Sequence, residues 1–250
     1  MISISGVELF RGKPIEIPNL CLVYAPTLND ICKIGELEYF KMVRLMTYDF
    51  IDVDIEVERL GIKEKLTVFD FFCKVLCASP WGWAYIQKAF QIFTKQQLIY
   101  DSETNSLFLK SNKIEKLTEE IFVTLQQVIA KQNLVEYELP PPEVSDPKMK
   151  RFYEKTLLGK KTKRKSKSGT KEESADDTTS FIKNAVSSLV LETGIFGKDL
   201  WDMSYYALMD LYDRLHAKIQ YDGDTQAIIA GGDSKKIKPK IWTMSLNRDE

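Results

Sequence analysis

The stretch from Gly159 to Thr179, GKKTKRKSKSGTKEESADDTT, constrains the fold more than any other part of the sequence, because it has no large apolar residue. Such a segment cannot bury enough surface to offset the entropy that a chain loses when it becomes ordered. Its first half is strongly basic and its second half is acidic. We therefore expect a flexible, charged linker that separates two folded parts of the chain.

The length of 250 residues allows one large domain or two modest ones, and the linker favours two. The composition, 44% hydrophobic and 28% charged, is typical of a globular protein. We expect a mainly α fold with small β-hairpins (α+β). Its expected parts are an N-terminal, mostly helical domain over residues 1–145, a helix and the charged linker over 146–179, and a C-terminal helical unit with a basic tail over 180–250.

Five segments of the N-terminal part have the pattern of β-strands. Val7–Phe10 and Ile15–Ile17 flank a Gly/Pro turn, and Leu98–Tyr100 and Leu107–Leu109 flank a polar loop, so each pair predicts a hairpin. Apolar and acidic residues alternate from Ile51 to Glu58, which predicts a half-buried strand with one acidic face.

Helices are predicted between these strands from their caps and their apolar spacing. Thr27, Thr67 and Thr118 are each placed to cap a helix at its N-terminus, and Gly35 is expected to break the first one. Pro80 ends one helix and opens the next. A further helix is expected from about Pro147 to Leu158, just before the linker.

The C-terminal part predicts a small set of helices. Ser180 or Thr179 caps a first helix that Gly194 ends, and Ser204 caps a second. Tyr205, Leu208, Tyr212, Leu215 and Ile219 fall on one face of the second helix. The sequence Asp222-Gly223-Asp224 then predicts a turn into a short helix over 225–230.

Several patterns bear on the location of the protein. The N-terminal residues lack the basic start and apolar core of a secretory signal, and no apolar run reaches the roughly 20 residues that cross a bilayer. The four cysteines have no CxxC spacing, so buried free thiols in a reducing cytosol are expected. We expect a cytoplasmic protein that contacts no membrane.

The sequence offers little support for catalysis. The Asp52/Asp54 and Asp222/Asp224 pairs supply too few oxygen ligands for a divalent cation. His216 is the single histidine, has no evident nucleophile nearby in sequence, and is expected on a helix face near solvent. We expect no metal, no cofactor and no enzymatic activity.

The basic part of the linker, residues 160–171, supports an alternative hypothesis, a nucleic-acid-binding adaptor. No aromatic residue lies among the cations to stack on bases, and acidic residues follow at once, so a linker is favoured over a nucleic-acid site. The candidate nucleic-acid residues are Lys160, Lys161, Lys163, Arg164, Lys165 and Lys167.

Aromatic residues gather in the C-terminal part, where two interpretations remain open. They form the core of a small helical unit, or they line an exposed surface that holds a partner. The candidate partner-binding residues are Trp201, Tyr205, Tyr206, Leu208, Tyr212 and Trp242.

The order of these features resembles that of the tail assembly chaperones of long-tailed bacteriophages. The resemblance rests on Trp201, Ser204-Tyr205-Tyr206, Tyr221, Gln226-Ala227 and Gly231 through Trp242, and it is sharpest over Leu200–Trp242. This sequence has Gly231-Gly232 where the family pattern has Gly-Ala.

The resemblance implies a non-enzymatic function in the host cytoplasm. Such chaperones bind the long, helical, apolar tape-measure protein and keep it soluble until tail-tube subunits polymerise around it. The implied partners are the tape-measure protein and the tail-tube protein. Self-association is left open beside them.

Overall fold

The structure is a computed structural model in which residues 4–18, 20–104, 106–110, 114–140, 146–169, 180–194, 197–233 and 236–241 are described. The chain divides into two compact units. Unit 1 comprises the described residues within Met1–Pro14, Ala25–Glu36 and Thr179–Glu250, and unit 2 those within Ile15–Tyr24 and Leu37–Thr178. Each unit therefore combines segments that are distant in the sequence, whereas the sequence analysis expected consecutive domains.

Unit 2 is mainly helical and carries two small sheets, which confirms the expected fold class. In the N-terminal part of unit 2 the elements are β1 (Ile15–Ile17), β2 (Cys21–Val23), α3 (Glu36–Met46), α4 (Phe50–Arg59), α5 (Val68–Phe71), the π-helical turn η1 (Phe72–Leu76) and α6 (Pro80–Thr94). They are followed by β3 (Gln97–Asp101), β4 (Ser106–Lys110), β5 (Ile114–Leu117), α7 (Glu119–Gln132) and α8 (Pro147–Gly169).

Both sheets are antiparallel. The first is the β1–β2 hairpin, in which Ile15 pairs with Val23. The second has the order β3-β4-β5, with Leu98 opposite Leu109 and Leu107 opposite Leu117. The predicted hairpin around residues 101–106 is therefore confirmed.

Aromatic side chains fill the core of unit 2. The ring centroids of Phe72 and Phe122 lie 4.5 Å apart, which joins η1 to α7. Tyr39 is buried against Phe93, and its hydroxyl donates a hydrogen bond of 2.5 Å to Asn133 Oδ1. The polar end of Tyr39 is thus satisfied inside the core, as burial requires.

The predicted strand over Val7–Phe10 is wrong, because this segment is the helix α1 (Gly6–Phe10). Ser5 caps α1, and the side chain of Glu8 accepts a hydrogen bond from the Ser5 backbone to complete a capping box. Ile15–Ile17 does form a hairpin, but with Cys21–Val23. The capping box therefore favours a helix in this segment, although the short apolar run alone predicted a strand.

The predicted strand over Ile51–Glu58 is also wrong, because the segment is α4. The Asp49 carboxylate accepts hydrogen bonds from the N–H groups of Ile51, at 2.9 Å, and Asp52, at 3.1 Å. Apolar residues that alternate along the chain also recur every four positions, so Ile51 shares one face of the helix with Ile55 and Val53 shares another with Val57, and the helix buries Ile51 and Val53.

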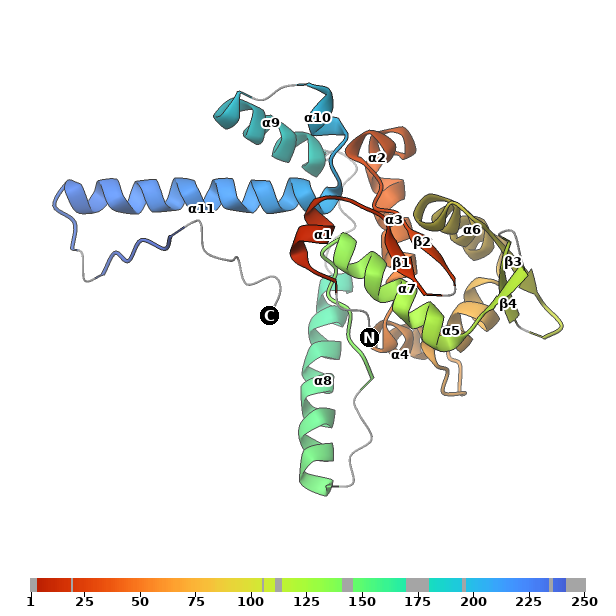
Figure 1. Ribbon diagram of the computed structural model, residues 1–250. Helices are drawn as coiled ribbons and strands as arrows, with labels where there is room; N and C mark the ends of the chain where they lie inside the picture. Colours follow the sequence, from red (N-terminus) through yellow and green to blue (C-terminus); the bar gives the residue numbers. More distant parts are fainter. Residues whose placement is uncertain are drawn as a thin grey trace. The chain divides into compact units, whose positions relative to one another are not determined.

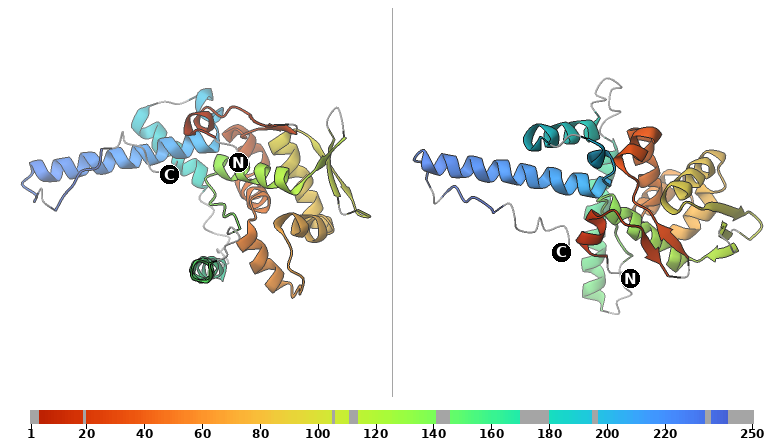
Figure 2. Two further views of the ribbon diagram at one scale, coloured as in Figure 1. Left: turned by 60° about the horizontal axis from the view of Figure 1, so that its bottom comes forward. Right: turned by 45° about the horizontal axis from the view of Figure 1, so that its top comes forward.

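The linker prediction is wrong for residues 159–169, which continue α8 as a helix. Basic side chains of this part form ion pairs with acidic residues of unit 2, and lysine favours helix. Residues 170–179 of the expected linker lie outside the described part of the chain. Figure 2, left, looks nearly along the axis of α8.

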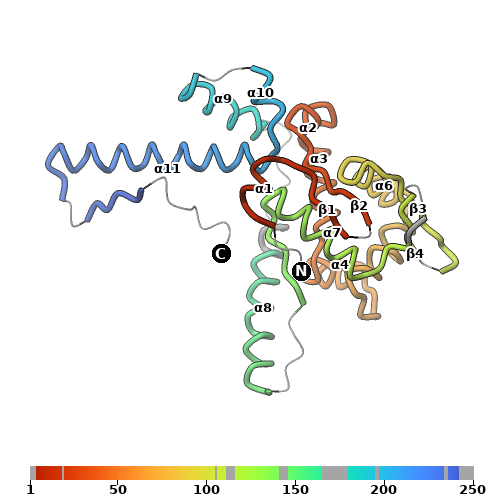
Figure 3. Tube along the Cα trace, viewed as in Figure 1, coloured from red at the N-terminus to blue at the C-terminus, as the bar shows by residue number. Residues whose placement is uncertain are grey.

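Unit 1 is helical, and its elements come from three segments of the chain. They are α1, α2 (Leu28–Ile34), α9 (Phe181–Thr193), α10 (Lys198–Trp201) and α11 (Tyr205–Ile229). Figures 1 and 3 show α9 alongside the N-terminal part of α11, while the rest of α11 extends beyond it. The buried apolar residues of this unit include Leu28, Ile31, Ile182, Ala185, Leu189, Leu200, Tyr206 and Leu208.

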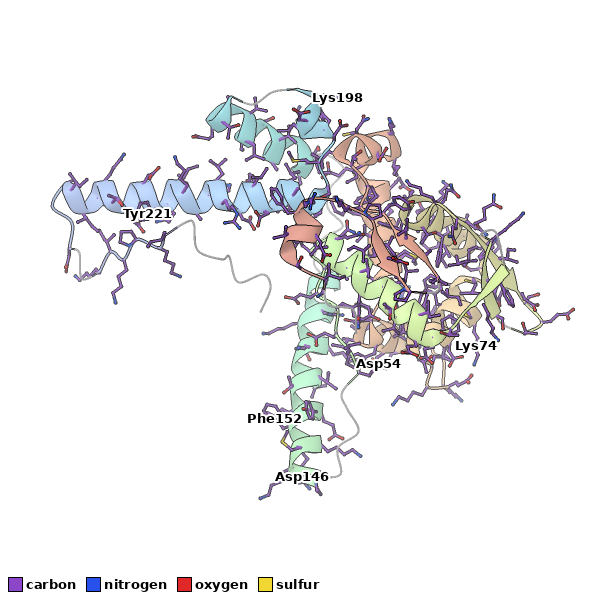
Figure 4. All side chains as sticks on the ribbon, in the orientation of Figure 1. Asp54, Lys74, Asp146, Phe152, Lys198 and Tyr221 are labelled. Carbon is purple, nitrogen blue, oxygen red and sulfur yellow. The ribbon has the colours of Figure 1, made fainter. Side chains whose placement is uncertain are left out.

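The predicted turn at Asp222-Gly223-Asp224 is wrong, because α11 runs through it without a break. Side-chain pairs one turn apart support the helix there: Lys218 Nζ lies 3.2 Å from Asp222 Oδ2, and Gln220 Nε2 donates to Asp224 Oδ1 at 2.8 Å. Figure 4 labels Tyr221 in this part of α11.

The cysteines are reduced, and their burial differs. Cys73 and Cys77 are buried as expected, whereas Cys21 is half-buried and Cys32 is exposed, so the expectation of burial is wrong for Cys32. Burial raises the pKa of the Cys73 thiol to about 12. Among the described helices, none is both long enough and apolar enough to cross a membrane.

Candidate protein-binding pocket

The N-terminal segments of unit 1 are joined to the start of α11 by backbone contacts. The Leu28 N–H donates to the Met203 carbonyl at 2.9 Å, and Thr27 and Ser204 form an isolated antiparallel bridge. Ser204 caps α11, since its Oγ accepts from the Ala207 N–H at 3.2 Å. This arrangement fixes the position of the first turn of α11 within the unit.

A glycine allows the loop after α1 to approach the same place. Gly12 has a φ of +61°, a conformation that favours glycine. A side chain at this position would begin 3.5 Å from the Ser204 Cβ. An added Cβ would therefore make only an ordinary van der Waals contact with Ser204, so it is the positive φ that favours glycine here.

These segments line a cavity of about 300 Å³ that is open to solvent. Its apolar wall comes from α1, the segment before α2, and the start of α11. The residues that line it are Phe10, Arg11, Gly12, Ala25, Thr27, Asp199, Asp202, Met203, Ser204, Ala207 and Leu211.

Charged groups of both signs lie in the lining. Arg11, Asp199 and Asp202 are exposed, and none of them forms an ion pair with another residue of the described ranges. Their charges are therefore available to an incoming ligand. Apolar walls with a few charged groups are typical of a site that binds one side chain of a protein partner.

Ser204 at the cavity and His216, the single histidine, are not placed to act together. The Ser204 hydroxyl is occupied as a helix cap. His216 lies exposed further along α11, where its ring is 4.4 Å from that of Tyr212. Twelve residues of helix separate it from Ser204, about 18 Å at 1.5 Å per residue, which is too far for proton transfer between them. The position predicted for His216 is confirmed.

The candidate partner-binding residues from the sequence do not line the cavity. Tyr206 and Leu208 are buried, and they belong to the core of unit 1. Trp201, Tyr205 and Tyr212 are half-buried. None of these five residues lines the cavity. Trp242 lies outside the described residues.

Tyr212 also has neighbours within its own unit. Its ring centroid lies 6.0 Å from that of Phe181, in an edge-on arrangement that joins α9 to α11. Of the two interpretations left open by the sequence, core packing therefore describes Tyr206, Leu208 and much of Tyr212.

The sequence analysis missed the residues that do line the cavity. Ser204, Ala207 and Leu211 follow one another at helical spacing, so a second face of the same helix could have been recognised. Phe10 and Arg11 were assigned to a hairpin, and no sequence pattern indicated that they approach α11.

The candidate nucleic-acid residues are partly engaged within unit 2. Lys160 pairs with Glu138, Lys161 pairs with Glu58 and lies 3.8 Å from Asp54, and Arg164 lies 2.8 Å from Asp49 and 3.2 Å from Asp52. Lys163 is exposed, and the side chains of Lys165 and Lys167 lie outside the described part. At least three of the six cations are therefore committed to internal ion pairs.

The environment of Asp52 follows from this cluster. Burial raises the pKa of the Asp52 carboxyl, and the neighbouring charge of Asp49 raises it further, while Arg164 opposes both effects. Asp52 and Asp54, proposed and rejected as a metal pair from sequence, instead face Arg164 and Lys161. Over the described ranges, no three His, Cys, Asp or Glu residues lie close enough together to hold a metal ion.

Comparison with known proteins gives one match. Residues 171–247 match a family described as the YomV second domain. This is a phage-type protein family, and the match supports a bacteriophage origin for the chain. It spans α9, α10 and α11, and residues of α10 and of the start of α11 line part of the cavity. No curated protein and no solved structure matches the chain.

Proposed function

We propose that this chain is a non-enzymatic tail assembly chaperone of a bacteriophage, which binds the helical tape-measure protein in the host cytoplasm. The observation that carries the proposal is the cavity of about 300 Å³ between α1 and α11, with its apolar wall and unpaired charges. A cavity of this size accepts one large apolar side chain of a partner helix. The phage-type family match to the C-terminal segment supports the same context.

Further apolar side chains on unit 1 favour a protein partner over a small ligand. Val7 is 69% exposed, and Leu191 and Ile229 are exposed to 85% and 80%. A long apolar helix covers such side chains, whereas a small ligand leaves them in water. The tail-tube protein and a second copy of the chain are further partners within this proposal.

The test is co-expression with the tape-measure protein of the same genome. The chain is expected to bring the otherwise insoluble partner into solution and to co-purify with it. Phe10→Ala removes part of the cavity wall, and Arg11→Glu reverses one of its charges. Both variants should recover several-fold less partner, because truncating a buried contact at an interface typically costs about 1–3 kcal/mol.

Two matched variants control for folding and for general charge. Leu60→Ala truncates a 51% exposed apolar side chain of unit 2 that does not line the cavity, and Lys13→Glu makes the same charge change as Arg11→Glu two residues further on. Both should recover the partner at the wild-type level. Aggregation of the partner in the presence of the wild-type chain would refute the chaperone proposal. Purification of the chain with nucleic acid, lost steeply with added salt, would favour the adaptor hypothesis instead.

A further inference from the structure

The helix α8 has two halves that differ in their contacts. In the C-terminal half, Lys160, Lys161 and Arg164 pair with acidic residues on α4 and on the segment after α7. The Arg164 guanidinium lies 2.8 Å from Asp49, a carboxylate with no exposed surface. These ion pairs fix the C-terminal half of α8 within unit 2.

The N-terminal half presents large apolar side chains to solvent. Phe152 is 63% exposed and Leu158 is 65% exposed. Lys161 follows Phe152 by nine positions, which at 3.6 residues per turn places the side chains of Phe152 and Lys161 on opposite sides of the helix. Figure 4 shows Phe152 near the Asp146 end of α8. The anchored face and the face with Phe152 are therefore different faces of one helix.

The face with Phe152 is also strongly basic. Lys148, Arg151 and Lys155 lie on it by helical spacing, and all are exposed. None of the three forms an ion pair with another residue of the described ranges. We call Lys148, Arg151, Phe152, Lys155 and Leu158 the outer face of α8.

We propose that the outer face of α8 binds an acidic amphipathic helix of a partner protein. The partner's apolar side chains cover Phe152 and Leu158, and its carboxylates pair with Lys148, Arg151 and Lys155. The argument is charge complementarity: three unpaired cations surround two exposed apolar side chains on a helix that its other face holds in place. This surface belongs to unit 2 and is separate from the cavity of unit 1.

Two other anionic partners fit the outer face less well. A lipid surface requires a continuous apolar stripe, and here Arg151 and Lys155 separate the two apolar side chains around the helix. A nucleic acid offers phosphates to the cations but leaves the aliphatic side chain of Leu158 in water. A protein helix satisfies both kinds of group at once.

The test uses the full chain and a synthetic helix-forming peptide of Glu, Leu and Ala residues with one apolar face. Fluorescence anisotropy of the labelled peptide should show saturable binding to the wild-type chain. The double variant Arg151→Glu/Lys155→Glu should weaken binding about tenfold or more, because two attractive pairs become repulsive. Phe152→Ser should weaken binding by a similar factor, and a scrambled peptide of the same composition should bind more weakly.

Matched variants separate this effect from net charge and from general loss of apolar surface. Lys63→Glu/Lys65→Glu makes the same charge change at exposed loop positions, and Leu60→Ser removes a 51% exposed side chain elsewhere in the unit. Both should bind the peptide like the wild type. Equal binding of the scrambled peptide would overturn the proposal.

Three further outcomes would also overturn the proposal. They are binding to phosphatidylserine vesicles without binding to the peptide, binding to duplex DNA without binding to the peptide, and self-association that the Arg151→Glu/Lys155→Glu variant abolishes. The recovery of tape-measure protein by the Phe10 and Arg11 variants reports on the cavity alone. Failure of one proposal is therefore distinguishable from failure of the other.

Discussion

At the scale of single residues, the Asp49 carboxylate determines how α4 and α8 are held together. It accepts hydrogen bonds from the N–H groups of Ile51 and Asp52 and from that of Glu138 at 2.9 Å. Arg164 supplies the nearest positive charge, at 2.8 Å. A buried carboxylate with four donors is stable as long as all of them remain.

Replacing Arg164 should therefore destabilise the fold. Arg164→Ala leaves the buried Asp49 without a cation, and we expect it to lower the free energy of unfolding by about 2 kcal/mol. Lys155→Ala, at an exposed and unpaired position of the same helix, serves as the control and should change the stability by less than about 0.5 kcal/mol. Urea titration measures both. Equal midpoints for the two variants would contradict the pairing.

Asp52 predicts that stability falls as the pH rises, which is opposite to the usual effect of a carboxylate stabilised in its charged form. Its pKa is raised in the folded protein, first by burial and then by Asp49, so the folded state favours the protonated form. Its contribution to stability is therefore greatest at low pH and is lost as the pH rises through the raised pKa. Asp52→Asn should stabilise the protein more at pH 7 than near pH 3, which lies below the ordinary carboxyl pKa, so that the aspartic acid is largely protonated in the folded and the unfolded state. The same urea titrations at the two values of pH test this.

At the scale of elements, the sequence predicted most helix starts because caps are local. Thr27, Thr67, Thr118 and Ser204 each cap a helix as expected, since the side chain and the N–H that it accepts from are three residues apart. The apolar spacing gave a wrong prediction where the same residues fit both a strand and a helix. Apolar residues spaced by two also recur at four, so Ile51–Glu58 satisfies both a strand and α4.

The prediction for Gly223 distinguishes a helix from a turn. Gly223 lies inside α11, and a Cβ there would meet no atom within 4 Å, so Gly223→Ala should stabilise the protein by about 0.5–1 kcal/mol. Gly231→Ala is the matched control: its φ of +95° favours glycine, and alanine there should lower the stability. Thermal unfolding followed by circular dichroism measures both. A loss of stability in Gly223→Ala would indicate the turn that the sequence suggested.

At the scale of the whole molecule, the contacts that define unit 1 join residues far apart in the chain. The Leu28 N–H donates to Met203, and the Glu36 carboxylate accepts from the Ser180 hydroxyl and from the Ile182 N–H at 3.3 Å. No pattern in a single sequence indicates such pairs, because each segment taken alone is an ordinary helix. For the same reason the sequence did not indicate the cavity that residues of the Trp201–Tyr212 segment line together with Phe10.

The C-terminal segment should therefore depend on the N-terminal one for stability. A fragment of residues 180–250 lacks α1, α2 and the Glu36 carboxylate, so part of its apolar surface is uncovered and the start of α9 loses a hydrogen-bond acceptor. We expect this fragment to be less helical than in the full chain and to unfold at a lower temperature. Addition of a peptide of residues 25–36 should restore part of the helical signal, because that segment supplies Leu28 and Glu36, whereas a scrambled peptide should not. Unfolding of the fragment at the temperature of the full chain would show instead that α9, α10 and α11 form an autonomous domain.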